Sequence, residues 1–324
     1  MVTAIVMERT GGVEVLRPRQ VELPPPGPGE VRVRHAAIGV NFVDIYHRTG
    51  LYPLPALPAV PGVEGAGRVE AVGEGVAGLA VGDRVAYAGL PAGGYAEARN
   101  IPAARLVRLP DGISETLAAA SMLRGLTAHM LLHRVAPVKP GDTVLIHAAA
   151  GGLGLILTQW AKRLGATTIG TVGSDAKAQL ALDNGLDHAI LYREADFAAA
   201  TRTLTGGRGV DAAFDGIGGD TLARTLDCVR PFGMVASIGQ ADGPLAPLDL
   251  AEVGPRRSLS LSRPSVFAYA NNAVSYAEGA AALFAVLADG LDVTVGAEYP
   301  LADAADAHRA LEGGRSVGSL LLVP

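Results

Sequence analysis

The sequence predicts an α/β protein, in which a β-rich domain is joined to a doubly wound parallel sheet. Three observations predict this. From Val2 to about Leu109, short apolar stretches are broken by glycine and proline. From about residue 141, stretches typical of strands alternate with stretches typical of helices, which indicates right-handed βαβ units. A run of small residues, HAAAGGLGLI at 147–156, stands at the first strand-to-helix junction of that alternation.

The first third is predicted to be a compact β domain because apolar stretches and turn residues follow one another at short intervals. A helix is expected over 116–135, where apolar residues recur at intervals of three and four. The expected strands lie within TAIVM (3–7), EVRVRHAAIGV (30–40), GAGRVEAVG (65–73), GDRVAYAG (82–89) and GGYAEARNI (93–101).

The alternating region then predicts the elements of the parallel sheet. Strands are expected at 143–148, 167–172, 188–192, 210–215, 232–238 and 258–262, and helices at 152–164, 175–184, 196–204 and 219–228. Two further helices, about 275–289 and 302–312, precede the final strand GSLLLVP. A terminal strand of this kind often returns to an earlier sheet, so we expect the first domain to be discontinuous.

Composition excludes several classes of protein. The net charge of -5 and the absence of a basic block disfavour nucleic-acid binding. No apolar stretch reaches the roughly 18 residues that a membrane helix needs, so we expect a soluble, cytoplasmic protein. Cys228 is the only cysteine, which excludes an intrachain disulfide and a multi-thiolate zinc site.

The small-residue run corresponds to the pattern G-x-G-x-x-G, with Ala149 at its first position. Small residues at such a turn let the backbone approach a pyrophosphate, whose charge is held by the amides of the following helix. The alternative is a turn that only packs a helix against the sheet. The residues expected to contact the cofactor here are Ala150, Gly151, Gly152, Leu153 and Gly154.

The end of the second strand favours NADPH over NADH. An NAD-binding unit usually has a carboxylate there, whereas this chain has Gly173 and Ser174, with Lys177 one turn later and Tyr192 at the end of the third strand. A phosphate group suits this set. Asp175 remains an alternative partner for the ribose of NAD if the strand runs longer.

At this point the sequence resembles a known family. The stretch GDTVLIHAAAGGLGLILTQWAK (141–162) is similar to the signature of the zinc-independent, zeta-crystallin-like NADPH:quinone oxidoreductases of the medium-chain dehydrogenase/reductase superfamily. Four further segments extend the resemblance over nearly the whole chain: GVNFVDIYHRTGLYP (39–53), PGVEGAGRVEAVG (61–73), GDRVAY (82–87) and SRPS (262–265).

The resemblance implies two domains and a set of site residues. A GroES-like catalytic domain is expected over 1–123, with 265–324 returning to it, a Rossmann NADPH-binding domain over 124–264, and a cleft where they meet. The implied catalytic residues are Asn41, Asp44, Tyr46, Tyr52 and Arg263, of which Tyr46 is the leading candidate. Further implied cofactor contacts are Tyr46, Thr127, Ile238, Gly239, Gln240, Ser262 and Arg263.

Zinc is not expected. Where zinc alcohol dehydrogenases have Gly-His-Glu, this chain has Val63 before Glu64, and it lacks the cysteine ligands. His129 and His133 have the i, i+4 spacing of a helical metal site, but no third ligand is evident. Hydride transfer to an electron-poor quinone tolerates the absence of a Lewis acid.

Two other functions stay open. An NADPH-dependent reductase of α,β-unsaturated ketones or enals would use the same hydride geometry. An RNA-binding or structural, crystallin-like role is disfavoured by the negative charge and the intact glycine-rich turn.

We also expect a homodimer, because the last sheet strand, SLSLS at 258–262, has no charge or proline to prevent edge pairing with a second copy.

Overall fold

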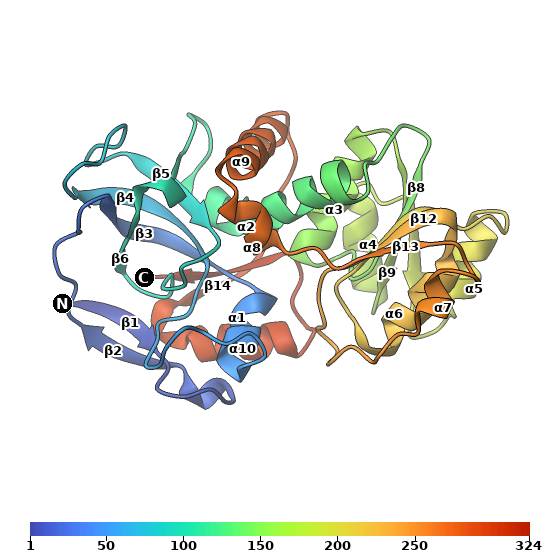
Figure 1. The fold of residues 1–324 in the computed structure, drawn as a ribbon, viewed down its shortest axis with the longest axis horizontal. Coiled ribbons are helices and arrows are strands. Elements are labelled where there is room, and N and C mark those ends of the chain that lie inside the picture. Colours follow the sequence, from blue (N-terminus) through green and yellow to red (C-terminus); the bar gives the residue numbers. More distant parts are fainter. The chain divides into compact units, whose positions relative to one another are not determined.

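The computed structural model describes residues 1–324 and divides into two compact units. The first unit comprises Met1–Leu126, Val266–Asp289 and Val293–Pro324, and the second comprises Thr127–Ser265 and Gly290–Asp292. The chain therefore leaves the first unit, builds the second and returns. Figure 1 shows the elements of both units.

The first unit is built on a seven-stranded sheet of order β14-β15-β3-β4-β5-β7, with β6 also paired to β3. The last strand runs antiparallel to β3, with Leu320 opposite Val40, so the predicted return of the terminal strand is confirmed. The strands are β3 (Glu30–Val40), β4 (Glu64–Val72), β5 (Arg84–Ala88), β6 (Ala98–Pro102), β7 (Val107–Arg108), β14 (Val295–Pro300) and β15 (Ser319–Val323). A separate hairpin pairs β1 (Val2–Val6) with β2 (Arg17–Val21).

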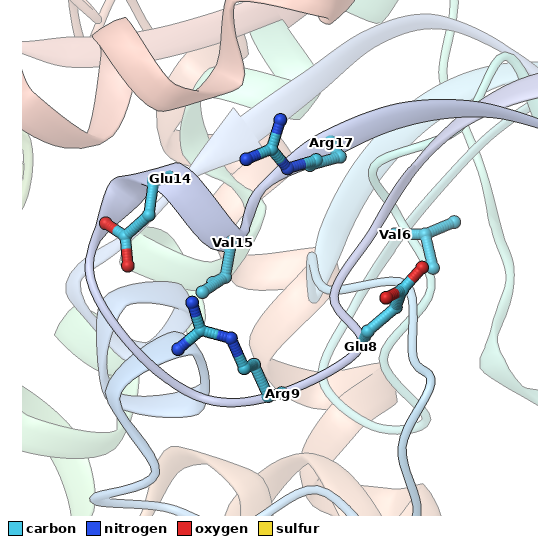
Figure 2. Close-up of a pocket in the computed structure, with 6 residues that line it drawn as sticks. All are labelled: Val6, Glu8, Arg9, Glu14, Val15 and Arg17. Carbon is cyan, nitrogen blue, oxygen red and sulfur yellow. The ribbon is translucent and has the colours of Figure 1, made fainter.

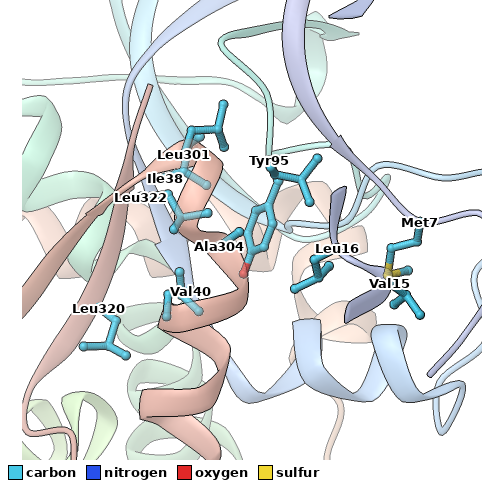
Figure 3. Packing of buried hydrophobic residues seen from close by; sticks show 12 residues of the cluster. Met7, Val15, Leu16, Ile38, Val40, Tyr95, Leu301, Ala304, Leu320 and Leu322 are labelled. Carbon is cyan, nitrogen blue, oxygen red and sulfur yellow. The ribbon is translucent and has the colours of Figure 1, made fainter. Parts of the chain in front are cut away.

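One apolar core of this unit lies against the helix α10 (Ala304–Glu312). Alternation along a strand puts Ile38 and Val40 of β3 on one face, and Leu320 and Leu322 of β15 join them there. Figure 3 shows these side chains with Tyr95 among them. Residues from both ends of the chain thus share one core.

The second unit holds a six-stranded sheet of order β10-β9-β8-β11-β12-β13, and every pairing in it is parallel. This confirms the predicted fold class. The chain order reverses between β8 and β11, which is where ligands bind in doubly wound sheets. The strands are β8 (Thr143–Ile146), β9 (Thr167–Val172), β10 (His188–Leu191), β11 (Val210–Asp215), β12 (Val229–Ser237) and β13 (Ser260–Ser262), and the helices are α3 (Gly152–Arg163), α4 (Asp175–Asp183), α5 (Phe197–Leu204), α6 (Gly219–Thr225) and α7 (Leu250–Val253).

Several element boundaries differ from the expectations. The helix expected over 116–135 is α2 (Glu115–Met130), followed by a π-helical turn over Leu131–Val135. The expected helix over 219–228 ends at Thr225 and continues as a 3-10 turn. The edge strand begins at Ser260 rather than 258, because Ser258 has a left-handed φ of 54° that no regular strand accommodates.

Some elements of the first unit had no counterpart in the sequence-based expectations. The helix α1 (Phe42–Thr49) interrupts a region expected to be all strands, and α8 (Val266–Asn271) precedes α9 (Ala273–Ala288). The strands β2 and β14 were also unexpected. None of the helices combines the length and apolar character required to cross a membrane.

Candidate active site

The glycine-rich turn brings α3 close to the end of β8. A Cβ at position 154 would lie 2.4 Å from the carbonyl oxygen of Ala148 and 2.7 Å from Cα of Ala149, so only glycine allows this approach. The helix α3 begins after Gly151 with no side-chain cap and no acidic residue in its first turn. The backbone N–H groups of that turn therefore suit an anion such as a pyrophosphate.

His147 lies directly before this turn, and both nitrogens of its ring have a partner. Its Nδ1 lies 2.9 Å from Oγ1 of Thr171, and its Nε2 lies 2.9 Å from Oγ1 of Thr225. Because the hydroxyl of Thr225 donates to the carbonyl oxygen of Thr221, it accepts from Nε2–H, which fixes the tautomer. Burial lowers the pKa of His147 to about 4, so the ring stays neutral. No role for His147 was expected from the sequence.

The end of β9 carries the residues expected to choose between NADPH and NADH. The strand ends at Val172, and Asp175 is the first residue of α4 rather than a continuation of the strand. The Ser174 hydroxyl caps α4 by accepting the backbone N–H of Lys177. The Tyr192 hydroxyl lies beside Gly173, since a Cβ there would be 3.1 Å from it.

Arg193 joins this group and was missed in the sequence analysis. Its guanidinium carbon lies 5.9 Å from the centre of the Tyr192 ring. Burial and then the nearby charge of Arg193 lower the pKa of Lys177. Neighbouring cations of this kind suit an anionic ligand such as a phosphate. The signal was available, because Arg193 directly follows Tyr192.

The ends of β11, β12 and β13 form a third group. The buried carboxylate of Asp215 accepts the backbone N–H groups of Ile217 (2.7 Å) and Gly218 (3.1 Å). Arg263 donates to Ser237 Oγ at 2.9 Å and lies 3.4 Å from Gln240 Oε1. The structure thus gathers at this edge the expected residues Ile238, Gly239, Gln240, Ser262 and Arg263, whereas Thr127 lies on α2.

In the first unit, Asn41 and Asp44 form the start of α1. The Asn41 amide donates to Glu64 Oε2 at 2.8 Å, and its backbone N–H donates to Asp44 Oδ2 at 2.8 Å. Asp44 also accepts from the Tyr95 hydroxyl at 3.1 Å. Burial raises the pKa of this fully buried carboxyl to about 7. Both side chains are therefore bonded within the unit.

Tyr46 and Tyr52 form an aromatic cluster with Phe42. The two tyrosine rings meet edge to face with centroids 5.1 Å apart, and the Phe42 ring is 6.4 Å from that of Tyr46. The Tyr52 N–H donates to the Tyr46 carbonyl at 3.1 Å, which fixes the loop after α1. Clustered aromatic rings suit a flat conjugated ligand.

The residues present do not fit a zinc ion. The buried carboxylate of Glu64 is paired with Arg124 (3.2 Å) and accepts the Leu123 N–H (2.7 Å), so its oxygens are engaged. His129 and His133 lie 4.6 Å apart with both rings against Trp160, as packing residues. No group of three metal-ligating side chains occurs.

A small pocket in the first unit is lined by none of the site residues described above. Figure 2 shows it between the end of β1 and the start of β2. Its volume of about 170 Å³ is below the range typical of small-molecule sites. The lining alternates acids and bases, and we assign it no ligand. The lining residues are Val6, Glu8, Arg9, Glu14, Val15 and Arg17.

Comparisons with known proteins agree with this geometry. The family model of zinc-binding dehydrogenases matches residues 152–285, and that of alcohol dehydrogenase GroES-like domains matches residues 27–111. The chain is 45% identical to 2-haloacrylate reductase of Burkholderia sp over 100% of this chain and 99% of the relative. It is similar to the structure of Pseudomonas syringae pv. tomato DC3000 quinone oxidoreductase, with 46% identity, full coverage of both chains and a TM-score of 0.97.

A second solved structure is informative about the ligand. Escherichia coli quinone oxidoreductase complexed with NADPH is 43% identical to this chain, with a TM-score of 0.96 over 99% of this chain and 100% of that one. Similarity at this level extends through both units.

Proposed function

This chain belongs to the zinc-independent quinone oxidoreductase family of the medium-chain dehydrogenase/reductase superfamily, and on that premise we propose that it is an NADPH-dependent quinone reductase. The observation that carries the choice of NADPH is the pair of cations beside Ser174 and Tyr192 at the end of β9, where no carboxylate stands. NADPH, when bound, supplies a hydride to an electron-poor acceptor.

Each unit has its own task in this proposal. The first-turn amides of α3 bind the pyrophosphate, and Lys177 and Arg193 bind the ribose phosphate with the hydroxyl of Tyr192. Tyr46 and Tyr52 pack against the flat acceptor. Arg263, held by Ser237 and Gln240, supplies positive charge as the acceptor oxygen gains electron density.

An α,β-unsaturated carbonyl compound is the second candidate acceptor. The 45% identity to a 2-haloacrylate reductase supports it, because a conjugated carbonyl accepts a hydride in the same way.

A cytoplasmic location is part of the proposal, since the single buried cysteine requires no oxidising compartment.

Steady-state kinetics with NADPH test the proposal. The acceptors are 1,4-benzoquinone, 9,10-phenanthrenequinone, a simple enone and 2-chloroacrylate. A kcat/KM at least about tenfold higher for a quinone supports quinone reduction, because tenfold corresponds to 1.4 kcal/mol of transition-state binding. A preference for either conjugated carbonyl would move the assignment to the second candidate, and no turnover of any acceptor would refute both.

Metal independence is expected, because the donor set for zinc is missing. After exhaustive dialysis against a chelator, kcat and KM should equal those of untreated protein. Elemental analysis of the active protein is the second measurement. Stoichiometric zinc, with activity lost on its removal and restored on its return, would contradict this expectation.

We also propose a homodimer formed through the edge of the parallel sheet. β13 is the edge strand, and Leu261 within it is 37% exposed. The Ile238 N–H donates to the Asp215 carbonyl at 2.7 Å, so Met234 and Ala236 face β11 and Val235 faces β13. Because Met234 pairs with Ser260 and Ala236 with Ser262, the N–H groups of Ser260 and Ser262 must face β12. Because successive peptide groups of a strand point to opposite sides, the N–H of Leu261 points to the open edge.

Replacing Leu261 by proline is expected to release monomers, because it removes that outward N–H from pairing with a second copy. Leu261→Ala is the matched control, since it shortens the side chain and keeps the N–H. Light scattering measures the mass of each variant. A monomeric wild type, or a Leu261→Pro variant that is still fully dimeric, would show that this edge is not the interface.

A further inference from the structure

A chain of hydrogen bonds links α1 and α10 in the interior of the first unit. Nη1 of Arg48 lies 3.5 Å from Nδ1 of His308. Nε2 of His308 lies 3.0 Å from the Tyr95 hydroxyl, which lies 3.1 Å from Oδ2 of Asp44. Arg48 is 2% exposed and the other three side chains are 0% exposed. Figure 1 shows α1 and α10 side by side.

The direction of every bond in this chain is fixed. A guanidinium only donates, so Nδ1 of His308 accepts from Arg48 and Nε2 carries the ring hydrogen. That hydrogen is donated to the Tyr95 oxygen, and the Tyr95 hydroxyl donates in turn to Asp44. Burial and then the charge of Arg48 lower the pKa of His308 to about 3, so the ring remains neutral. A neutral imidazole can accept and donate at once.

The hydrogen-bond chain is attached to one face of α1 at two positions, Asp44 and Arg48. Asp44 and Arg48 are four residues apart and share a face of the helix, as Phe42 and Tyr46 share another. Positions two apart differ by about 200° around a helix, so Tyr46 lies nearly opposite the anchored face. The Arg48 end is closed by Glu312 of α10, which accepts from Arg48 Nη1 at 2.9 Å.

We propose that Tyr95 and His308 are positioning residues, which fix α1 and through it the Tyr46 ring for the acceptor. This inference rests on the proposed function, which assigns Tyr46 to the acceptor. Neither residue itself touches substrate in the proposal. Figure 3 shows the Tyr95 ring among the core side chains, and its hydroxyl bonds on both sides, to α1 and to α10.

Asp44 makes the stability that this hydrogen-bond chain contributes depend on pH. Its carboxyl interacts with Glu64 of β4, which raises its pKa, and with Arg124 of α2, which lowers it, besides its bonds to Asn41 and Tyr95. Burial has the largest effect and raises the pKa to about 7. The folded pKa exceeds the unfolded one, so the stability from protonated Asp44 is complete below about pH 4 and is lost as pH rises through 7. Removing the Tyr95 hydroxyl raises the pKa further.

The test compares Tyr95→Phe with Tyr87→Phe. Tyr87 is a matched control, because its buried hydroxyl also bonds a buried histidine, with 2.8 Å to Nε2 of His35. Above pH 7, where Asp44 is charged, losing a hydrogen bond to it corresponds to at least about a tenfold effect. We expect Tyr95→Phe to lower kcat/KM for 1,4-benzoquinone about tenfold and to leave the NADPH Kd within about twofold, and Tyr87→Phe to change neither.

Two readouts do not depend on activity. Amide hydrogen exchange in residues 41–52 should be about tenfold faster in Tyr95→Phe. Local opening of this segment breaks one hydrogen bond fewer in the variant, so the open state is about tenfold more populated. The decline of Tm with rising pH should extend to a higher pH in Tyr95→Phe, because the folded pKa of Asp44 is raised further. Both should match wild type in Tyr87→Phe. These readouts test the positioning role even if the wild type reduces no quinone, a result that refutes the proposed function alone.

Variants of His308 complete the test. His308→Gln keeps one acceptor and one donor and should retain most of the wild-type exchange protection at 41–52, whereas His308→Leu should lose it. Equal loss of kcat/KM in the two tyrosine variants, or unchanged exchange at 41–52 in Tyr95→Phe, would overturn the proposal.

Discussion

Replacing Lys177 by alanine is expected to weaken NADPH binding by about 1.5 to 3 kcal/mol, the range for hydrogen bonds to charged groups, and to leave NADH binding nearly unchanged. The reason is the placement of Lys177 in the turn of α4 that follows Ser174, within reach of the charge of Arg193. Of the two cofactors, only NADPH carries the ribose phosphate that the two cations would bind.

Titration with both cofactors measures this effect, and Lys139→Ala is the matched control. Lys139 is another of the three lysines. Its backbone N–H donates to the carboxylate of Asp142, just before β8, and it is not among the residues proposed to bind the ribose phosphate. Arg193→Ala should show the same selectivity for NADPH as Lys177→Ala. Equal weakening of NADPH and NADH in the Lys177 variant would remove this residue from the phosphate site.

Replacing Gly154 by alanine is expected to reduce both NADPH binding and the stability of the second unit. The added Cβ would lie 2.4 Å from the Ala148 carbonyl oxygen, and backbone cannot move aside as a flexible side chain can. The helix α3 must then shift from the turn, which misplaces the amides that would hold the pyrophosphate. Overpacking of this kind costs about 1 to 3 kcal/mol of unfolding free energy.

Thermal unfolding without cofactor and a fluorescence titration with NADPH check the two effects separately. Gly254→Ala is the control in the same unit, since its Cβ would meet its nearest atom only at 3.4 Å and its φ of -81° is not in the left-handed region that favours glycine. If Gly154→Ala unfolds and binds NADPH as Gly254→Ala does, the close approach of α3 does not limit this residue to glycine.

The cofactor turn and the parallel sheet could be predicted from the sequence because their determinants are local. Strand-to-helix alternation sets the topology, and β9 ends at Val172 where glycine and a helix-capping serine follow. The same locality disfavoured a zinc site, since the chain has a single cysteine and has Val63 where zinc alcohol dehydrogenases have histidine. The edge position of β13 also followed from chain order.

The arrangement around α1 was decided by the tertiary structure alone. This helix has only eight residues, and α10, from the far end of the chain, supplies His308 and Glu312 as partners for its Arg48. Nothing in the periodicity of FVDIYHRT indicates those partners, and isolated helices of this length are unstable in water. Hydrogen bonds between segments so distant in sequence exist only once β15 has paired with β3 and brought the last helix to the first core.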